Sequence, residues 1–284
     1  CAAAGVKKPL FVTDKALASL PITADAVAVL KAAGLGTAVF SEVDPNPNEK
    51  NMADGIAVYL AGGHDGVICF GGGSALDLGK MIALMAHQRK DLSVWDLEDV
   101  DDWYTRADAA KIAPIIAVPT TAGTGSEVTL VAVIRDEGSG RKVPFTSPFL
   151  LPQLAVLDPR LTQGLPLNIT AATAMDAMTH AIEAFIGNGK NPVSDALALM
   201  AVEKIADALP KVLLAPEDKA LRLQLAEGST LAGMAFSNSM VGLVHALGHS
   251  LGARCHLPHG LCMNLFLPAV LDYNRPQIDP ELAR

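Results

Sequence analysis

The chain has 284 residues, of which half are apolar and 18% are charged, so it can bury the core of one large domain or two smaller ones. Its net charge is −8 without a block of like charges, which argues against nucleic acid as a partner because phosphate binding needs clustered Lys and Arg. No uncharged apolar run reaches the roughly 18 residues of a membrane span, so we expect no membrane partner.

The cysteines and the N-terminus bear on where the protein works. The four cysteines show neither a CxxC spacing nor a dense pattern, which is typical of free thiols in a reducing, cytoplasmic compartment. They are Cys1, Cys69, Cys255 and Cys262. The N-terminus has no starting Met and does not fit a signal peptide. We therefore interpret the sequence as a fragment of a longer protein.

The first half of the chain alternates short apolar runs with helical stretches. The apolar runs lack polar alternation, as expected for strands buried on both faces, and lie at 9–13, 37–40, 66–70 and 113–119. Further strand candidates are 128–135 and 154–157. Helical spacing occupies 14–33, 48–62 and 74–87. Repeated strand–helix–strand order predicts parallel pairing in a doubly wound, Rossmann-like α/β sheet.

After about Pro166 the pattern becomes helical throughout. Helical periodicity covers 169–186, 192–213, 219–235, 241–253 and 259–273, and β-rich runs are scarce. We therefore expect two domains, an α/β domain over 1–162 and an all-α domain over 163–284 that is incomplete at its C-terminus.

Two small-residue loops follow predicted strands. Gly71 to Ser74 lies between a buried strand and a helix, where glycines let a phosphate approach the backbone and the helix start offers free N–H groups. By itself it is equally well explained as a ligand-free turn. The second loop, Pro119 to Glu127, follows the next buried strand. Two such loops at the carboxyl ends of strands favour one nucleotide-binding crevice.

The helical half carries candidate metal ligands. Asp176 and His180 are four residues apart and face one side of a helix, and His245 and His249 repeat that spacing. His259 follows a proline at the start of a further helix. A single pair with this spacing would more often be a coincidence of core or surface packing. Two pairs and His259, in helices made otherwise of Ala, Leu, Gly and Met, indicate a cation that satisfies these polar groups. The spacing leaves open which histidine of each pair is a ligand.

Four segments together resemble the iron-containing (group III) alcohol dehydrogenases. They are GGGSALDLGK (71–80), PTTAGTGSEVT (119–129), MDAMTHAIEAF (175–185) and GLVHALGHSLGARCHLPHG (242–260), in the family's order and spacing. The resemblance covers essentially the whole chain, although relatives extend further at both ends. It implies a nucleotide domain that binds NAD or NADP, followed by a helical metal domain that holds Fe(II), with Zn also possible.

The resemblance also implies roles for particular residues. Asp176, His180, His245 and His259 match the family's metal ligands, whereas His249 matches a catalytic histidine close to the nicotinamide. The matching cofactor-binding positions are Gly72, Gly73 and Ser74 at the pyrophosphate, Asp77 in the same motif, Thr120, Thr121 and Thr124 along the crevice, Lys142 near the ribose, and Phe236 in the cofactor–substrate pocket.

The chain departs from the family's pattern at Ser41. Members that prefer NAD often carry Asp just after the second strand, where it bonds the adenosine ribose and repels a 2′-phosphate. Without that carboxylate, exclusion of NADP loses its obvious cause, unless the neighbouring Glu42 replaces it. Ser41 is therefore a further candidate contact to the cofactor.

The function implied is reversible hydride transfer between a small primary alcohol or diol and a nicotinamide ring, which converts the alcohol to its aldehyde. We expect the chain to work as a homodimer or a higher homo-oligomer. One alternative is a glycerol or polyol dehydrogenase of the same superfamily. His180 distinguishes the two, because the fourth ligand position usually differs in the glycerol dehydrogenases. A dehydroquinate-synthase-like lyase would need many Lys and Arg near the motifs, where this chain has few. A further alternative is an inactive, truncated nucleotide- or metal-binding remnant.

Overall fold

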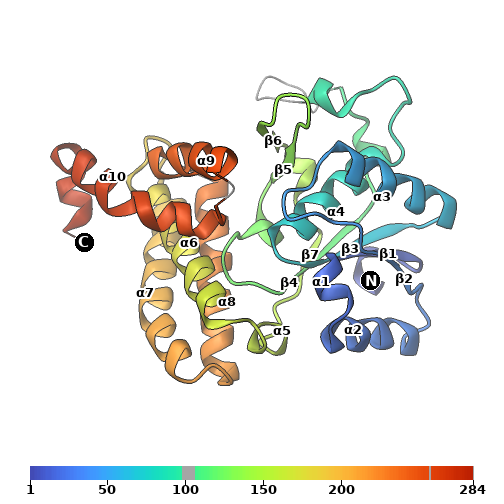
Figure 1. Cartoon of the computed structure of the whole chain (residues 1–284), viewed down its shortest axis with the longest axis horizontal. Helices are drawn as coiled ribbons and strands as arrows, with labels where there is room; N and C mark the ends of the chain where they lie inside the picture. The colour runs from blue at the N-terminus through green and yellow to red at the C-terminus, as the bar shows by residue number, and fades with distance from the viewer. Residues whose placement is uncertain (98–105, 256, 284) are drawn as a thin grey trace. The chain divides into compact units, whose positions relative to one another are not determined.

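The computed structural model describes residues 1–97, 106–255 and 257–283, and their contacts divide the chain into two units (Figure 1). The α/β unit comprises Cys1–Thr120 and Thr129–Val156, and the helical unit comprises Thr121–Val128 and Leu157–Arg284. The predicted domain ranges 1–162 and 163–284 stay a prediction. The short segment Thr121–Val128 belongs to the helical unit, although it directly follows a strand of the other unit.

The α/β unit contains a five-stranded parallel sheet with the order β2-β1-β3-β4-β7. Its strands are β1 (Pro9–Val12), β2 (Ala38–Phe40), β3 (Gly66–Gly71), β4 (Ile115–Pro119) and β7 (Leu154–Ala155). Strands β1 and β3 are buried along their whole length, which explains their uninterrupted apolar sequence. The predicted fold class is confirmed, with the strand order reversing between β1 and β3.

Helices cover both faces of this sheet. They are α1 (Lys15–Ala18), α2 (Pro21–Ala32), α3 (Glu49–Gly62) and α4 (Gly73–Met85). Right-handed crossovers require α3 and α4 to lie on one face and α2 on the other, as Figure 1 shows. The prediction of one helix over 14–33 was wrong: a new helix begins at Pro21, because proline has no N–H to continue the preceding one.

An antiparallel hairpin accompanies the parallel sheet. It pairs β5 (Val131–Arg135) with β6 (Lys142–Thr146). The predicted strand at 128–135 therefore exists, but in a separate two-stranded sheet, and its partner was not predicted because Pro144 interrupts it. Short 3₁₀ turns lie at Ala2–Ala4, Val94–Leu97, Ala109–Lys111, Ser126–Val128 and Pro148–Leu150.

A fully buried lysine ties α4 to the start of the hairpin. Lys80 has no exposed surface, and its Nζ donates to the carbonyl oxygens of Thr129 and Val131, both at 2.9 Å, and to Thr129 Oγ1 at 3.1 Å. An ammonium group has three donors and is buried at great cost unless they are satisfied. These contacts therefore hold the residues that follow the Thr121–Val128 segment.

The helical unit contains six helices among the described residues. They are α5 (Arg160–Gln163), α6 (Leu167–Ile186), α7 (Pro192–Leu214), α8 (Lys219–Ser237), α9 (Leu243–Cys255) and α10 (His259–Leu282). The predicted helices are present, and α10 continues beyond the predicted end at 273. Helix α7 packs against α6 and α8, and α10 packs against α6 and α9 (Figure 1). Many buried positions are alanine, which lets the helix axes approach closely.

The segment Thr121–Val128 packs on the helices through its glycines. A Cβ atom on Gly125, whose φ is +63°, would lie 2.6 Å from the Cα of Gly233 in α8. A Cβ on Gly123 would lie 2.8 Å from the carbonyl oxygen of Thr173 in α6. Buried Glu127 accepts a hydrogen bond of 2.7 Å from the Thr230 hydroxyl. Only a loop of small residues fits so close to two helices.

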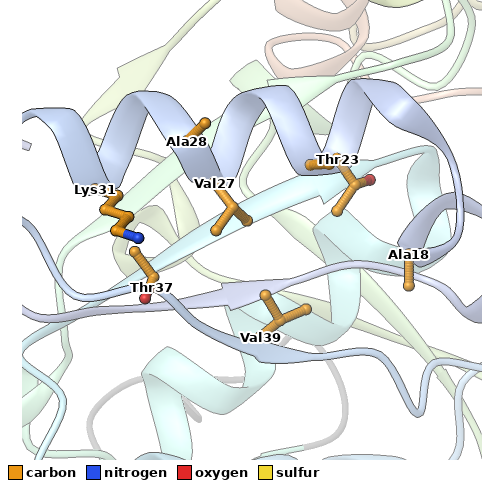
Figure 2. A pocket seen from close by; sticks show the side chains of 8 residues that line it. Ala18, Thr23, Val27, Ala28, Lys31, Thr37 and Val39 are labelled. Carbon is orange, nitrogen blue, oxygen red and sulfur yellow. The ribbon is translucent and has the colours of Figure 1, made fainter.

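A shallow groove of about 560 Å³ runs between α2 and the edge strand β2 (Figure 2). It is lined by Ala18, Thr23, Ala24, Val27, Ala28, Lys31, Thr37 and Val39. None of the predicted site residues lies in it. In the part of the chain that the structure describes, no helix combines the length and apolarity needed to cross a membrane.

We predict that Lys80→Met lowers the free energy of unfolding by about 2 kcal/mol or more, because the buried carbonyl of Thr129 and the partly buried carbonyl of Val131 lose their charged donor. Urea unfolding followed by circular dichroism measures the change. Lys31→Met, which removes an exposed lysine from α2, is the matched control and should stay within about 0.5 kcal/mol of the parent. Equal effects of the two substitutions would contradict the anchoring role.

Candidate functional site

Four side chains from three helices of the helical unit converge on one point. Helix α6 presents Asp176 and His180 one turn apart, α9 presents His245, and α10 begins with His259. One ligand atom from each lies within 4.8 Å of the others. Asp176 Oδ1 is 3.6 Å from His245 Nε2 and 3.3 Å from His259 Nε2. Atoms bound to a common ion at about 2.1 Å lie at most about 4.2 Å apart, so small side-chain adjustments would complete the site.

The cluster is buried and contains polar atoms that lack partners. Asp176, His180 and His245 are at most 5% exposed, while the His259 side chain is 32% exposed. Among the described residues, Asp176 Oδ1, His180 Nδ1 and His245 Nε2 find no hydrogen-bond partner. Buried polar atoms without partners are costly, and a cation would satisfy them. The residues present therefore fit a metal ion with nitrogen and oxygen ligands.

Aromatic stacking fixes the planes of two of these rings. The His180 ring stacks on His245 and on Phe236 of α8, with centroids 4.4 Å apart in both pairs and interplanar angles of 20° and 24°. Phe236 thus lies directly against the cluster and covers one side of His180. A ring held on both faces cannot rotate freely, so the site is organised by packing.

His249 stands beside the cluster rather than in it. It lies one turn after His245 on α9 and is partly exposed. Its ring centroid is 5.7 Å from that of His245 and 5.1 Å from that of His259. The spacing of the two histidine pairs left the ligand undecided, and the geometry favours His245 over His249.

The electrostatics of the cluster suit a cation. Burial lowers the pKa of His180 to about 3, so this ring is neutral near pH 7 and one of its two nitrogens offers a lone pair. Burial would also lower the pKa of His245, but the adjacent carboxylates of Asp176 and Glu183 outweigh this effect and raise it to about 9. Burial likewise opposes ionisation of Asp176, yet the surrounding imidazoles, His259 foremost, hold its pKa well below the usual range.

Glu183 is a functional candidate to which the motifs in the sequence assigned no role, although it lies in the segment 175–185. It is only 2% exposed, and its carboxylate contacts the Val244 N–H at 2.6 Å and His245 Nδ1 at 2.5 Å. The available signal was its spacing: Glu183 is seven residues after Asp176 and three after His180, on the same face of α6.

The glycine loop lies at the point where the strand order of the sheet reverses, which is where open α/β sheets bind ligands. Gly71 ends β3 with a φ of +151°, and a Cβ there would lie 2.8 Å from that of Ala75. Gly72 is the N-cap of α4, whose first N–H groups have no partner within the helix. The Thr120 N–H donates to the Gly71 carbonyl at 2.9 Å, so the ends of β3 and β4 meet here.

The other predicted cofactor residues are placed as follows. Ser74 donates its hydroxyl to the Pro45 carbonyl at 2.6 Å. Asp77 accepts from the Val133 N–H at 3.0 Å and so connects α4 to β5. Ser41 follows β2, Lys142 begins β6, and Thr121 and Thr124 lie in the segment packed on the helices. A contact of these residues with the cofactor stays a prediction.

Comparison with known proteins defines the class. The model of the family "Iron-containing alcohol dehydrogenase" matches residues 1–159, and that of "Fe-containing alcohol dehydrogenase family, C-terminal" matches residues 170–284. The chain belongs to the iron-containing alcohol dehydrogenase family. The predicted class, an oxidoreductase acting on CH–OH groups with a metal and a nicotinamide cofactor, is confirmed.

Individual relatives agree with this class. The chain is 36% identical over 270 residues to an NAD-dependent methanol dehydrogenase of Bacillus methanolicus, covering 95% of this chain and 69% of the relative. It is 39% identical over 277 residues to a 1,3-propanediol dehydrogenase of Klebsiella pneumoniae, covering 96% and 70%. A solved 1,3-propanediol oxidoreductase superposes with a TM-score of 0.91 at 39% identity, covering 97% of this chain and 70% of that one. A sulfoacetaldehyde reductase from Bifidobacterium kashiwanohense, solved with NAD⁺, gives 0.86 at 32% identity, covering 96% and 70%.

Proposed function

We propose that this chain interconverts a small primary alcohol or diol and its aldehyde, with Fe(II) held by Asp176, His180, His245 and His259. The observation that carries the proposal is the convergence of ligand atoms from these four side chains within 4.8 Å, three of the buried atoms having no hydrogen-bond partner among the described residues. Relatives named for methanol, 1,3-propanediol and lactaldehyde support a small oxygenated substrate. The reaction transfers a hydride between the alcohol carbon and the nicotinamide ring.

The ligand set favours iron over zinc. Catalytic zinc usually keeps three protein ligands and one open position, whereas four protein ligands plus a substrate suit a metal with five or six ligands. The set contains one carboxylate and three imidazoles and no thiolate. A divalent ion bound there supplies Lewis-acid polarisation of the alcohol or aldehyde oxygen.

The chain's own residues contribute positioning and proton transfer. The Phe236 ring, stacked on His180, shields that side of the cluster from water. Partly exposed His249, between the buried histidines and solvent, is suited to carry the alcohol proton outward, because imidazole titrates near neutral pH. The start of α4 at Gly72 is suited to the pyrophosphate of the cofactor, since its N–H groups and helix dipole favour an anion.

Assembly and location extend the proposal. We infer a homodimer or higher homo-oligomer, supported by the apolar side chains of Leu261, Leu265 and Tyr273 that α10 exposes and a second copy would bury. We also infer a cytoplasmic protein, supported by the four cysteines, all in the described part of the chain, which form no disulfide.

We predict turnover with both NADH and NADPH, because Ser41 offers no negative charge to repel a 2′-phosphate. The kcat/KM values for the two cofactors should differ by less than about a thousandfold, which corresponds to about 4 kcal/mol. Steady-state kinetics at saturating aldehyde measure the ratio. Ser41→Asp, which restores a carboxylate at this position, should shift the ratio toward NADH by at least about tenfold.

Glu42 is the control for this prediction. Its carboxylate is exposed and lies 2.8 Å from Lys15 Nζ, so it is directed toward a compensating charge. Glu42→Gln should therefore change the cofactor ratio less than Ser41→Asp does. A large preference for NADH that Glu42→Gln abolishes would show that Glu42 supplies the repulsion instead.

We predict that the ligand residues and His249 differ in what their loss removes. Ala at Asp176, His180, His245 or His259 should remove metal and activity together, because each substitution deletes one direct bond to the ion. His249→Ala should keep the metal and lose rate by up to about 10²–10⁴-fold, the range of general acid–base catalysis. The measurement is iron content per chain after anaerobic purification, together with turnover of a panel of short alcohols and diols.

His87→Ala is the matched control, because His87 is an exposed histidine of the α/β unit, and it should change neither quantity. Loss of iron in His249→Ala with retention in His259→Ala would reverse the assignment. Full iron occupancy in the parent without turnover of any alcohol would contradict the proposed function itself.

A further inference from the structure

We propose that Glu183 is a positioning residue that holds the proton of His245 on Nδ1 and so directs the bare Nε2 of this ring at the metal. This inference rests on the proposed metal centre. It assigns a task to a buried carboxylate that belongs neither to the four converging ligands nor to the nucleotide loops.

The contacts of Glu183 join two helices at the metal cluster. The residue lies on α6, on the face that presents Asp176 and His180, and is only 2% exposed. One carboxylate oxygen, Oε1, accepts from the Val244 N–H at 2.6 Å, and the other, Oε2, lies 2.5 Å from His245 Nδ1. Both oxygens are thus engaged with adjacent residues of α9.

The polarity of these contacts sets the tautomer of His245. An ionised carboxylate only accepts hydrogen bonds, so Nδ1 must carry the proton that it shares with Glu183. A metal binds the ring in its neutral form, in which Nε2 is then the nitrogen without a proton. Nε2 lies 3.6 Å from Asp176 Oδ1 and has no hydrogen-bond partner among the described residues. A metal-ligating histidine needs this arrangement, in which the second nitrogen donates to a carboxylate that fixes the ring and raises its basicity.

The same carboxylate also fixes where α9 begins. Val244 is the second residue of α9, and its N–H is one of the first four of the helix, which have no acceptor within it. A negative charge at this position also interacts favourably with the helix dipole. The close fit depends on Gly242, where a Cβ would lie 3.0 Å from Glu183 Oε1. Helix start and ring orientation therefore depend on one side chain.

An amide of the same shape cannot replace the carboxylate. Both partners of Glu183 are donors, and glutamine offers only one acceptor oxygen. In Glu183→Gln the oxygen can serve Val244, in which case the amide NH₂ faces His245 Nδ1 and drives the proton to Nε2, where the metal should bind. If the amide is flipped, its oxygen faces His245 and its NH₂ group faces the Val244 N–H. Two donors then oppose each other at the start of α9.

The experiment compares Glu183→Gln with the parent and with Glu227→Gln, which removes a half-exposed carboxylate of α8 paired with Lys204. Affinity for Zn²⁺ is measured by competition with a chelator, and the Nδ1 proton of His245 is observed by ¹⁵N-edited NMR in the metal-free protein. We expect Zn²⁺ affinity to fall about 10–100-fold in Glu183→Gln and to stay unchanged in Glu227→Gln. The downfield, slowly exchanging Nδ1 proton of the parent should disappear only in Glu183→Gln.

Unchanged Zn²⁺ affinity in a folded Glu183→Gln variant would overturn the inference. Weakened affinity with the Nδ1 proton retained would also overturn it, because the loss would then have another cause. Glu183→Asp keeps two acceptor oxygens on a shorter side chain and should therefore retain part of the Zn²⁺ affinity. This variant tests the inference if Glu183→Gln does not fold. If the parent itself binds no metal, the proposed metal centre fails, while the Nδ1 signal still tests the role of Glu183.

Discussion

The helical unit is organised around a carboxylate placed where a carboxylate alone would be unstable. Asp176 is 2% exposed and is surrounded by three imidazole rings, and its Oδ1 lacks a hydrogen-bond partner among the described residues. Desolvating a charge without compensation costs several kcal/mol. The arrangement is stable only if protons or a cation supply positive charge at this point, which links the packing of α6, α9 and α10 to the chemistry of the site.

Small residues make this convergence possible. The positions buried between α6, α7 and α8 are mostly alanine. At the start of α10, a Cβ on Gly260 would lie 2.4 Å from the carbonyl oxygen of Ala172 in α6, and a Cβ on Gly248 of α9 would displace the Met263 side chain of α10. Close helix packing brings side chains from three helices within reach of one ion. Stacking of Phe236 on His180 and the contact of Glu183 with His245 then restrict the orientation of these two rings.

The segment Thr121–Val128 follows a strand of the α/β unit directly, belongs to the helical unit and contains residues predicted to contact the cofactor. Thr120 ends the parallel sheet beside the glycine loop, whereas the next residue already packs with the helices. Gly123 lies against α6, the helix that presents Asp176 and His180, and Glu127 bonds to α8. At its far end, buried Lys80 holds Thr129 in the α/β unit. Residues predicted to line the cofactor crevice are therefore contiguous in the chain with residues packed behind the metal ligands.

The sequence by itself determined the elements whose signal is local or repeated. Uninterrupted apolar runs identified the strands β1, β3 and β4, since strands buried on both faces need no polar alternation, and helical spacing placed Asp176 with His180 on one face of α6. The break at Pro21 was missed although its signal was local, and the strand at 142–146 was missed because Pro144 interrupts its pattern. Spacing left His245 and His249 equivalent; the family resemblance favoured His245, and the tertiary structure places that side chain in the cluster. Only the tertiary structure decided that Glu183 lies behind His245 and that the loop after β4 packs on helices. These contacts join residues dozens of positions apart, and periodicity along one element carries no information about what packs against it.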